Sequence, residues 1–209
     1  MARVWGWPGS SWSVMVTVYK PRFEPGYDWA MPVGDEDPIL RLKSRSCGES
    51  WEPIWLYMTT TDHQGRPRQP ADLPWHGSQA LVAKEGARRI LEPVLRDDVE
   101  WLPAYDSEGE NLWLAHACRV IDALDEKRSK VERFQSSGRI MRVQRYVFQA
   151  EAVAGVRCFR LQQQPSQMFV TDEVVSTVEG GALHGTQFVP IWSSLEFSPM
   201  GLLAYSPVT

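Results

Sequence analysis

Two stretches of this chain are nearly the same, and this repetition constrains the fold more than any other feature of the sequence. They read SQALVAKE at residues 78–85 and SQMFVTDE at residues 166–173. Each is followed, some twenty positions later, by an aromatic residue two places before a proline, in Trp101-Leu102-Pro103 and in Phe188-Val189-Pro190. Two copies are too few for a solenoid, so we expect two related structural modules packed in one body.

Each copy predicts a strand, a helix and a second strand. In the first copy a short apolar run leads into residues with helical spacing, namely Ala87, Ile90, Leu91, Val94 and Leu95. Pro93 is expected to kink that helix or to end it early. In the second copy Thr171 is a candidate N-cap, and Gly180-Gly181 provides the stop.

Further strands are expected from apolar and β-favouring runs at residues 13–19, 39–43, 53–59, 112–124, 145–150 and 156–161. The predicted fold is therefore α+β, a mostly antiparallel sheet with two or three packed helices and an internal duplicated strand-helix-strand unit. We divide the chain into a β-rich N-terminal region with a Pro-rich loop, a core with the two units, and a C-terminal tail. Their bounds are 1–74, 75–192 and 193–209.

Composition indicates a soluble cytoplasmic protein. The 209 residues are 43% hydrophobic and 23% charged, and no apolar run is long enough for a membrane helix. The first residues have no apolar segment typical of a signal peptide. Three cysteines without close spacing, Cys47, Cys118 and Cys158, argue against a disulfide framework and fit a reducing compartment.

Charge is distributed in blocks. The net charge is −4, which argues against nucleic acid as a partner. Between residues 97 and 126 there are nine acids and one base, whereas residues 127–145 hold seven bases and one acid. The nine acids are Asp97, Asp98, Glu100, Asp106, Glu108, Glu110, Asp122, Asp125 and Glu126. Such blocks are typical of solvated faces, and the alternative is an acidic surface that meets a basic partner.

The sequence contains none of the common nucleotide-binding, zinc-protease, redox or serine-hydrolase motifs, and we predict no cofactor, no metal and no enzyme. The strongest enzymatic candidate is IDALDEKRS, where Asp122, Asp125 and Glu126 could act as an acid–base cluster on a small polar substrate. Local ion pairing and a strand end explain the same residues without catalysis. Of the histidines, His116 is expected in the core, while His63 and His76 are expected at the surface.

The order of the segments resembles a known family. LVAKEGARRILEPVLRDDVEWLPA, NLWLAHACRVIDALDEKRSKVE, YVFQAEAVAGVRCFRL and MFVTDEVVSTVEGGALHGTQFVPIW follow one another as in bacterial immunity family eleven, a set of polymorphic-toxin immunity proteins once described as a domain of unknown function. The resemblance covers about residues 75–192. The closing element is His184-Gly185-Thr186-Gln187-Phe188, where the family has a Gly-Leu-Arg-Phe type of sequence.

This resemblance implies a non-catalytic protein that binds and neutralises a toxin, some of the partner toxins being nucleases. Protection of self or kin cells would follow, in the setting of competition between bacteria. A regulatory protein-binding scaffold stays open as an alternative. An acidic stretch interleaved with aromatic residues suits a basic toxin surface, and the loop from Tyr105 to Glu110 is expected to form part of the contact surface. The predicted toxin-binding residues are Asp97, Asp98, Glu100, Trp101, Tyr105, Asp106, Glu108, Glu110 and Trp113.

Overall fold

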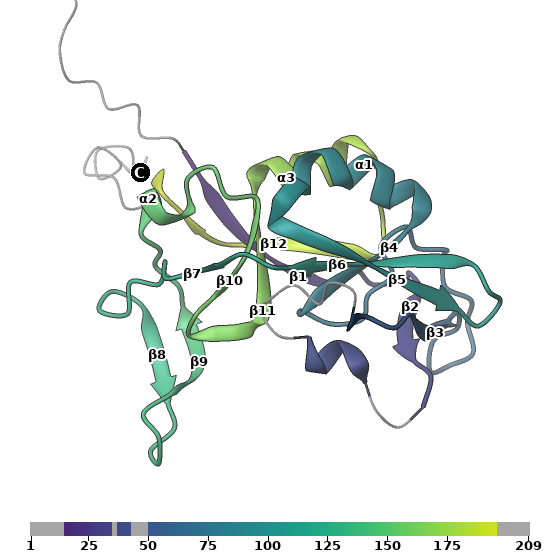
Figure 1. Cartoon of the computed structure of the whole chain (residues 1–209), viewed down its shortest axis with the longest axis horizontal. Coiled ribbons are helices and arrows are strands. Elements are labelled where there is room, and N and C mark those ends of the chain that lie inside the picture. Colours follow the sequence, from purple (N-terminus) through teal and green to yellow (C-terminus); the bar gives the residue numbers. More distant parts are fainter. Residues whose placement is uncertain (1–14, 35–36, 43–49, 196–209) are drawn as a thin grey trace, which may run out of the picture.

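The α+β fold is confirmed. The computed structural model describes residues 15–34, 37–42 and 50–195, and these contain twelve strands in mostly antiparallel sheets and three α-helices (Figure 1). Trp5, Trp7, Trp12, Cys47 and most of the predicted C-terminal tail lie outside the described residues. No helix in the described ranges has the length and apolar character that a membrane crossing requires.

The first sheet has five strands in the order β12-β1-β11-β10-β7. Their bounds are β1 (Thr17–Phe23), β7 (Val120–Ile121), β10 (Cys158–Leu161), β11 (Gln164–Thr171) and β12 (Thr186–Ser193). All neighbours are antiparallel except β7 and β10.

The second sheet also has five strands, in the order β2-β3-β5-β6-β4. Their bounds are β2 (Trp29–Pro32), β3 (Ile54–Thr59), β4 (Ala80–Lys84), β5 (Val99–Asp106) and β6 (Asn111–Ala117). Only β3 and β5 are parallel. A separate hairpin is formed by β8 (Lys130–Arg133) and β9 (Ile140–Arg145), and it projects from the body on the left of Figure 1.

The two similar stretches of sequence occupy similar places in the two sheets. Helix α1 (Glu85–Leu95) joins β4 to β5, and helix α3 (Asp172–Gly180) joins β11 to β12. In each case an antiparallel strand lies between the two joined strands, β6 in one sheet and β1 in the other. The strand-helix-strand order is thus present twice. That the two units arose by duplication stays a prediction.

The two helices lie side by side (Figure 1) and share one core with both sheets. Leu91 and Leu95 of α1 meet Val174 and Val178 of α3 in that core. The backbone amide of Met168 donates to Ser78 O at 2.8 Å, so the starts of the two similar stretches are in direct contact.

Two further hydrophobic cores lie on the sheet faces that point away from α1 and α3. An aromatic core with Phe148, Phe159, Phe169 and Trp192 lies between the first sheet and the segment from β7 to α2 (Ala150–Val153). An aliphatic core around Leu56, Leu102 and Leu114 lies on the second sheet under residues 39–42.

Four of the predicted strands are wrong in type or extent. The strand expected at residues 13–19 begins only at Thr17 and runs on to Phe23. Residues 38–41 form a 3-10 helix, because Pro38 sets the first turn and the Asp37 carboxylate accepts the Ile39 amide. The run 112–124 is broken after Ala117, since the chain leaves the second sheet there and enters the first at β7. Of residues 145–150, Arg145 ends β9 and Ala150 begins α2, and between them there is one isolated bridge, from Phe148 to Leu124.

The ends of the predicted helices are largely confirmed. Helix α1 ends at Leu95, two residues after Pro93, and α3 ends at Gly180 with Gly181 as its C-cap. Thr171 is the N-cap of α3 by position, but its side chain does not cap the helix. Its hydroxyl donates instead to the carbonyl of Val156 at 2.7 Å.

Candidate protein-binding face

Asp98, one of the predicted toxin-binding residues, is buried at the junction of the two sheets. Its carboxylate accepts hydrogen bonds from the backbone amides of Arg157 at 2.8 Å and Cys158 at 3.3 Å, and it pairs with Arg119 at 3.0 Å. These partners belong to two later segments, 21 and 59 to 60 residues further along the sequence, so Asp98 ties distant parts of the fold together at this point. Its neighbour Asp97 is exposed.

Asp106 has a comparable internal role at the end of β5. The side chain is buried, and Oδ1 accepts the backbone amides of Glu108 at 2.9 Å and Glu110 at 2.8 Å. An aspartate that accepts amides two and four residues ahead stabilises a tight connection, and here it shapes the turn between β5 and β6. Gly109 in this turn has φ +87°, a conformation that favours glycine.

The tip of this hairpin is exposed and acidic. Glu108 and Glu110 are both exposed, and within the described part of the chain neither side chain is assigned an ion-pair partner. Glu100, by contrast, is half-buried in β5 opposite His116 of β6.

The aromatic members of the predicted set share one face of the second sheet. Alternation along β5 puts Trp101 and Tyr105 on the same side, and the register pairs Pro103 between them with Trp113 of β6. Strand β3 extends the same face, because Trp55 pairs with Tyr105 and their ring centroids are 5.2 Å apart.

We call Trp55, Tyr57, Trp101, Tyr105 and Trp113 the open aromatic face. Helix α1 packs over β4 and β6 on this side, where Leu81, Ala83 and Ala115 are buried beneath it. The helix does not reach β3, and there Trp55 is 52% exposed and Tyr57 44% exposed. Large aromatic side chains exposed together on a sheet are a typical feature of protein-binding surfaces.

Arg88 of α1 lies at the boundary between the covered and the open parts of this face. Its guanidinium lies 4.2 Å from the ring centre of Trp113 and 6.0 Å from that of Trp101. The same group pairs with Glu92 at 2.8 Å and with Glu85 at 3.5 Å. The hydrogen bond from Arg89 lowers the pKa of Glu85, so this carboxylate is ionised at neutral pH.

Sequence reasoning missed Trp55 and Tyr57. Strand β3 reads Ile-Trp-Leu-Tyr-Met-Thr, with large apolar residues on both alternating faces. Its pattern therefore predicts a strand but does not distinguish the buried Leu56 side from the exposed Trp55 side. Only the position of α1 over the other half of the sheet decides this.

The carboxylates proposed for an enzyme each hold a different partner. Asp125 Oδ1 accepts the amides of Lys127 and Arg128, both at 3.1 Å. Asp122 accepts the side-chain amide of Gln163 at 2.8 Å, and Glu126 pairs with Arg133. These contacts match the structural interpretation, in which the aspartate shapes a turn at a strand end and local ion pairs use the remaining charges.

Two of the histidines, His76 and His116, have structural partners as well. His116 is buried as expected, and its Nδ1 lies 3.0 Å from an Arg160 nitrogen that can only donate, so Nδ1 accepts. His63 is exposed as expected, but the expectation for His76 is wrong. The His76 side chain is only 5% exposed, because it is held between Ala30 O and the Asp37 carboxylate.

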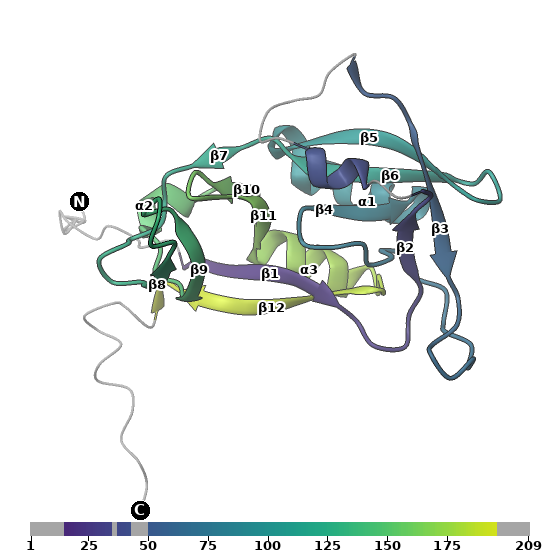
Figure 2. The same cartoon turned by 90° about the horizontal axis from the view of Figure 1, so that it is seen from below.

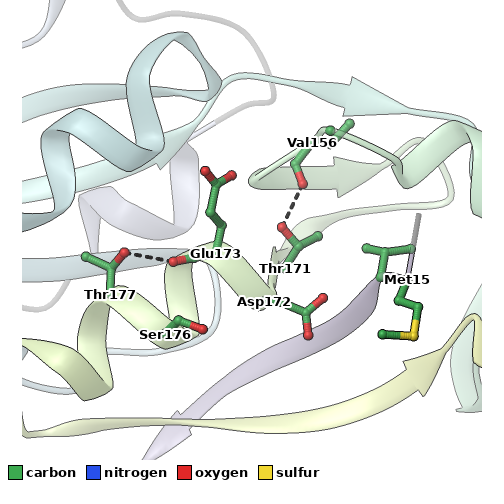
Figure 3. A pocket seen from close by; sticks show the side chains of 9 residues that line it. Met15, Val156, Thr171, Asp172, Glu173, Ser176 and Thr177 are labelled. Carbon is green, nitrogen blue, oxygen red and sulfur yellow. Dashed lines mark hydrogen bonds between the residues drawn. The ribbon is translucent and has the colours of Figure 1, made fainter. Parts of the chain in front are cut away.

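A hollow of about 520 Å³ lies at the start of α3 (Figure 3). The two carboxylates in its lining already have partners outside it: Asp172 accepts the amide of Thr17 at 2.6 Å and the hydroxyl of Tyr19 at 3.2 Å, and Glu173 pairs with Arg157 at 2.9 Å. The residues that the structure describes include no group of three or more His, Cys, Asp or Glu placed to hold a metal ion.

The comparison with protein families is decisive for the class of protein. The model of the Immunity protein family (Imm11) matches residues 35–193, which is 159 of the 209 residues. The chain belongs to the Imm11 immunity protein family. A search of curated proteins found no match.

The family match begins 40 residues earlier than the resemblance visible in the sequence. It therefore includes β3 and its Trp55 and Tyr57, and it ends with β12 at Ser193. All five residues of the open aromatic face lie inside the Imm11 region.

Proposed function

We propose that this Imm11 protein is an immunity protein that neutralises a cognate antibacterial toxin by binding it through the open aromatic face and the acidic hairpin tip beside it. Membership of the family supports the immunity role. The observation that carries the binding mode is the uncovered half of the second sheet, where Trp55 and Tyr57 remain exposed next to Tyr105.

The chemistry of this surface suits a partner with basic residues around an apolar patch. Exposed tryptophan and tyrosine supply apolar contact area with few rotatable bonds, and such residues often dominate the energy of an interface. Glu108 and Glu110 add negative charge that a basic partner can meet. Charge complementarity of this kind accelerates association and selects the partner.

A nuclease toxin fits this description because its substrate groove must be basic to hold phosphates. We propose such a toxin as the partner, and the cytoplasm as the place of protection. The free, buried thiol of Cys158 supports a reducing compartment. Asp98 and Asp106 contribute by holding the surface in shape, because their carboxylates are already engaged within the fold.

Co-expression with the toxin encoded beside the gene tests this function. We expect cells to survive and the two proteins to elute together from a sizing column. Survival without a complex would contradict neutralisation by binding and would favour an enzyme that reverses the damage. Loss of survival in Asp122→Asn with Asp125→Asn, with the complex intact, would favour the same alternative.

A further inference from the structure

The basic part of the sequence contributes to a second hollow, far along the chain from the acidic hairpin. It has a volume of about 400 Å³ and lies between β9 and the strands β1, β11 and β12 of the first sheet. Figure 2 shows β9 beside β1 and β12. We call it the basic pocket; its charged and polar lining residues are Lys20, Arg22, Arg142, Gln144, Arg145, Tyr146 and Gln164.

Lys20 lines the basic pocket and is held in place by neutral groups. Its ammonium donates to the hydroxyl of Tyr146 at 2.6 Å and lies 4.4 Å from the centre of the same ring. The Tyr146 hydroxyl donates in turn to Gln164 Oε1 at 2.8 Å. Lys20 is thereby fixed by neutral partners, and its positive charge is not compensated by them.

The other cations of the pocket add to this charge. No aspartate or glutamate lines the pocket, and none of Lys20, Arg22, Arg142 and Arg145 forms an ion pair with an acid among the residues described. Arg145 donates to the backbone carbonyl of Arg128. Elsewhere on the same hairpin Arg133 does have an acidic partner, Glu126.

The pKa of Lys20 reflects its burial and the cations around it. Burial, together with the charges of Arg22 and Arg142, lowers the pKa of Lys20 to about 8. The lysine is therefore still mostly protonated at pH 7, but in an environment that disfavours its charge. A negatively charged ligand would relieve that repulsion.

We propose that the basic pocket binds a small phosphate-bearing molecule with at least two negative charges. Guanidinium groups match the oxygen geometry of phosphate, and the ammonium group of a lysine adds a compact positive charge. The volume is within the range of small-molecule sites. This site is separate from the open aromatic face, and the proposal does not rest on the immunity function.

Calorimetric titration of the full chain with inorganic pyrophosphate, at pH 7 and fixed ionic strength, tests this proposal. We expect saturable binding, weakened at least tenfold in Lys20→Met and in Arg142→Gln. Arg139→Gln is the matched control, since Arg139 is an exposed cation of the same hairpin that does not line the pocket. We expect less than a twofold change there.

Absence of saturable binding, or an equal loss in Arg139→Gln, would overturn the proposal. A thermal melt of each variant distinguishes lost binding from lost structure, and we expect Lys20→Met to melt no lower than the parent, because it removes a disfavoured charge. A single-stranded oligonucleotide that bound more tightly than pyrophosphate, with equal losses in all three variants, would assign these charges to nucleic acid and contradict a small ligand.

The pH dependence supplies a second readout. Lys20 faces Arg22 on its own strand, Arg142 and Arg145 on β9, and the neutral groups of Tyr146 and Gln164. Affinity for pyrophosphate is expected to fall as the pH rises through about 8, where Lys20 loses its proton in the free protein. The fall should be absent in Lys20→Met. A parent profile that is flat from pH 7 to 9 would overturn the role of Lys20.

Discussion

Both large sheets carry an aromatic-rich face, but only one of these faces is covered. On the first sheet Phe159, Phe169 and Trp192 pack against Phe148, which belongs to the covering segment from β7 to α2. On the second sheet α1 covers only the β4 and β6 side, and the aromatic residues of β3 stay exposed. Similar composition thus serves internal stability in one sheet, and in our account it serves partner binding in the other.

The covered face should be the more sensitive to truncation. Phe159 is fully buried and its ring lies 5.3 Å from that of Phe169. Phe159→Ala is expected to lower the free energy of unfolding by about 3–5 kcal/mol, because it leaves a cavity in the aromatic core. Urea denaturation measures this loss. A loss below that of Trp55→Ala would contradict the distinction between covered and open faces.

Among the acids of the predicted binding stretch, the buried ones should affect stability more than the exposed ones. Asp98→Ala is expected to lower the free energy of unfolding by about 1–3 kcal/mol, because the buried amides of Arg157 and Cys158 lose their acceptor. Chemical denaturation at neutral pH checks this value. Stability equal to that of the parent would show that these amides find other partners.

The contribution of Lys20, which lies beside the aromatic core, to the free energy of unfolding should depend on pH. Lys20 has a pKa of about 8 in the folded protein, against the ordinary lysine value of 10.5, so the unfolded chain binds more protons between these values. Stability attributed to Lys20 therefore rises as the pH increases from 8 towards 10. Burial raises the pKa of Tyr146 to about 12, which acts in the opposite direction above pH 10. The unfolding free energy of the parent, minus that of Lys20→Met, should increase over pH 8–10; a constant difference would contradict this.

The acidic hairpin tip should have the smallest effect on stability. Glu108→Gln with Glu110→Gln is expected to change the free energy of unfolding by less than about 0.5 kcal/mol, since both side chains are exposed. Asp106 is left intact because its carboxylate shapes the turn. The association rate with the toxin should fall, and its dependence on salt should weaken. An unchanged rate would remove the tip from the interface.

Local sequence patterns predicted most helices and strands, but they did not predict which sheet each strand joins. The helical spacing before Pro93 and the Gly180-Gly181 stop gave α1 and α3 correctly, because these signals act within a few residues. The apolar run 112–124 gave one strand where the structure has two, in different sheets. Its break depends on Asp98 and Arg160, which are distant in sequence.

The candidate site was predictable to a similar degree. Pairing in the sheet places Trp101, Tyr105 and Trp113 on one face of the hairpin that carries the acidic tip. That these residues bind a toxin stays a prediction. Composition could not separate the buried Asp98 and Asp106 from the exposed Glu108 and Glu110. That separation depends on which carboxylates meet backbone amides after folding.

The most direct test of the account is the affinity of the toxin for a protein altered on the open aromatic face. Trp55→Ala with Tyr57→Ala should weaken binding at least about 30-fold, the equivalent of about 2 kcal/mol, while the fold stays intact. Phe134→Ala is the control, because Phe134 is a 48% exposed aromatic on the other hairpin. Equal affinity for the parent and the double variant would contradict the claim that this uncovered sheet face binds the toxin.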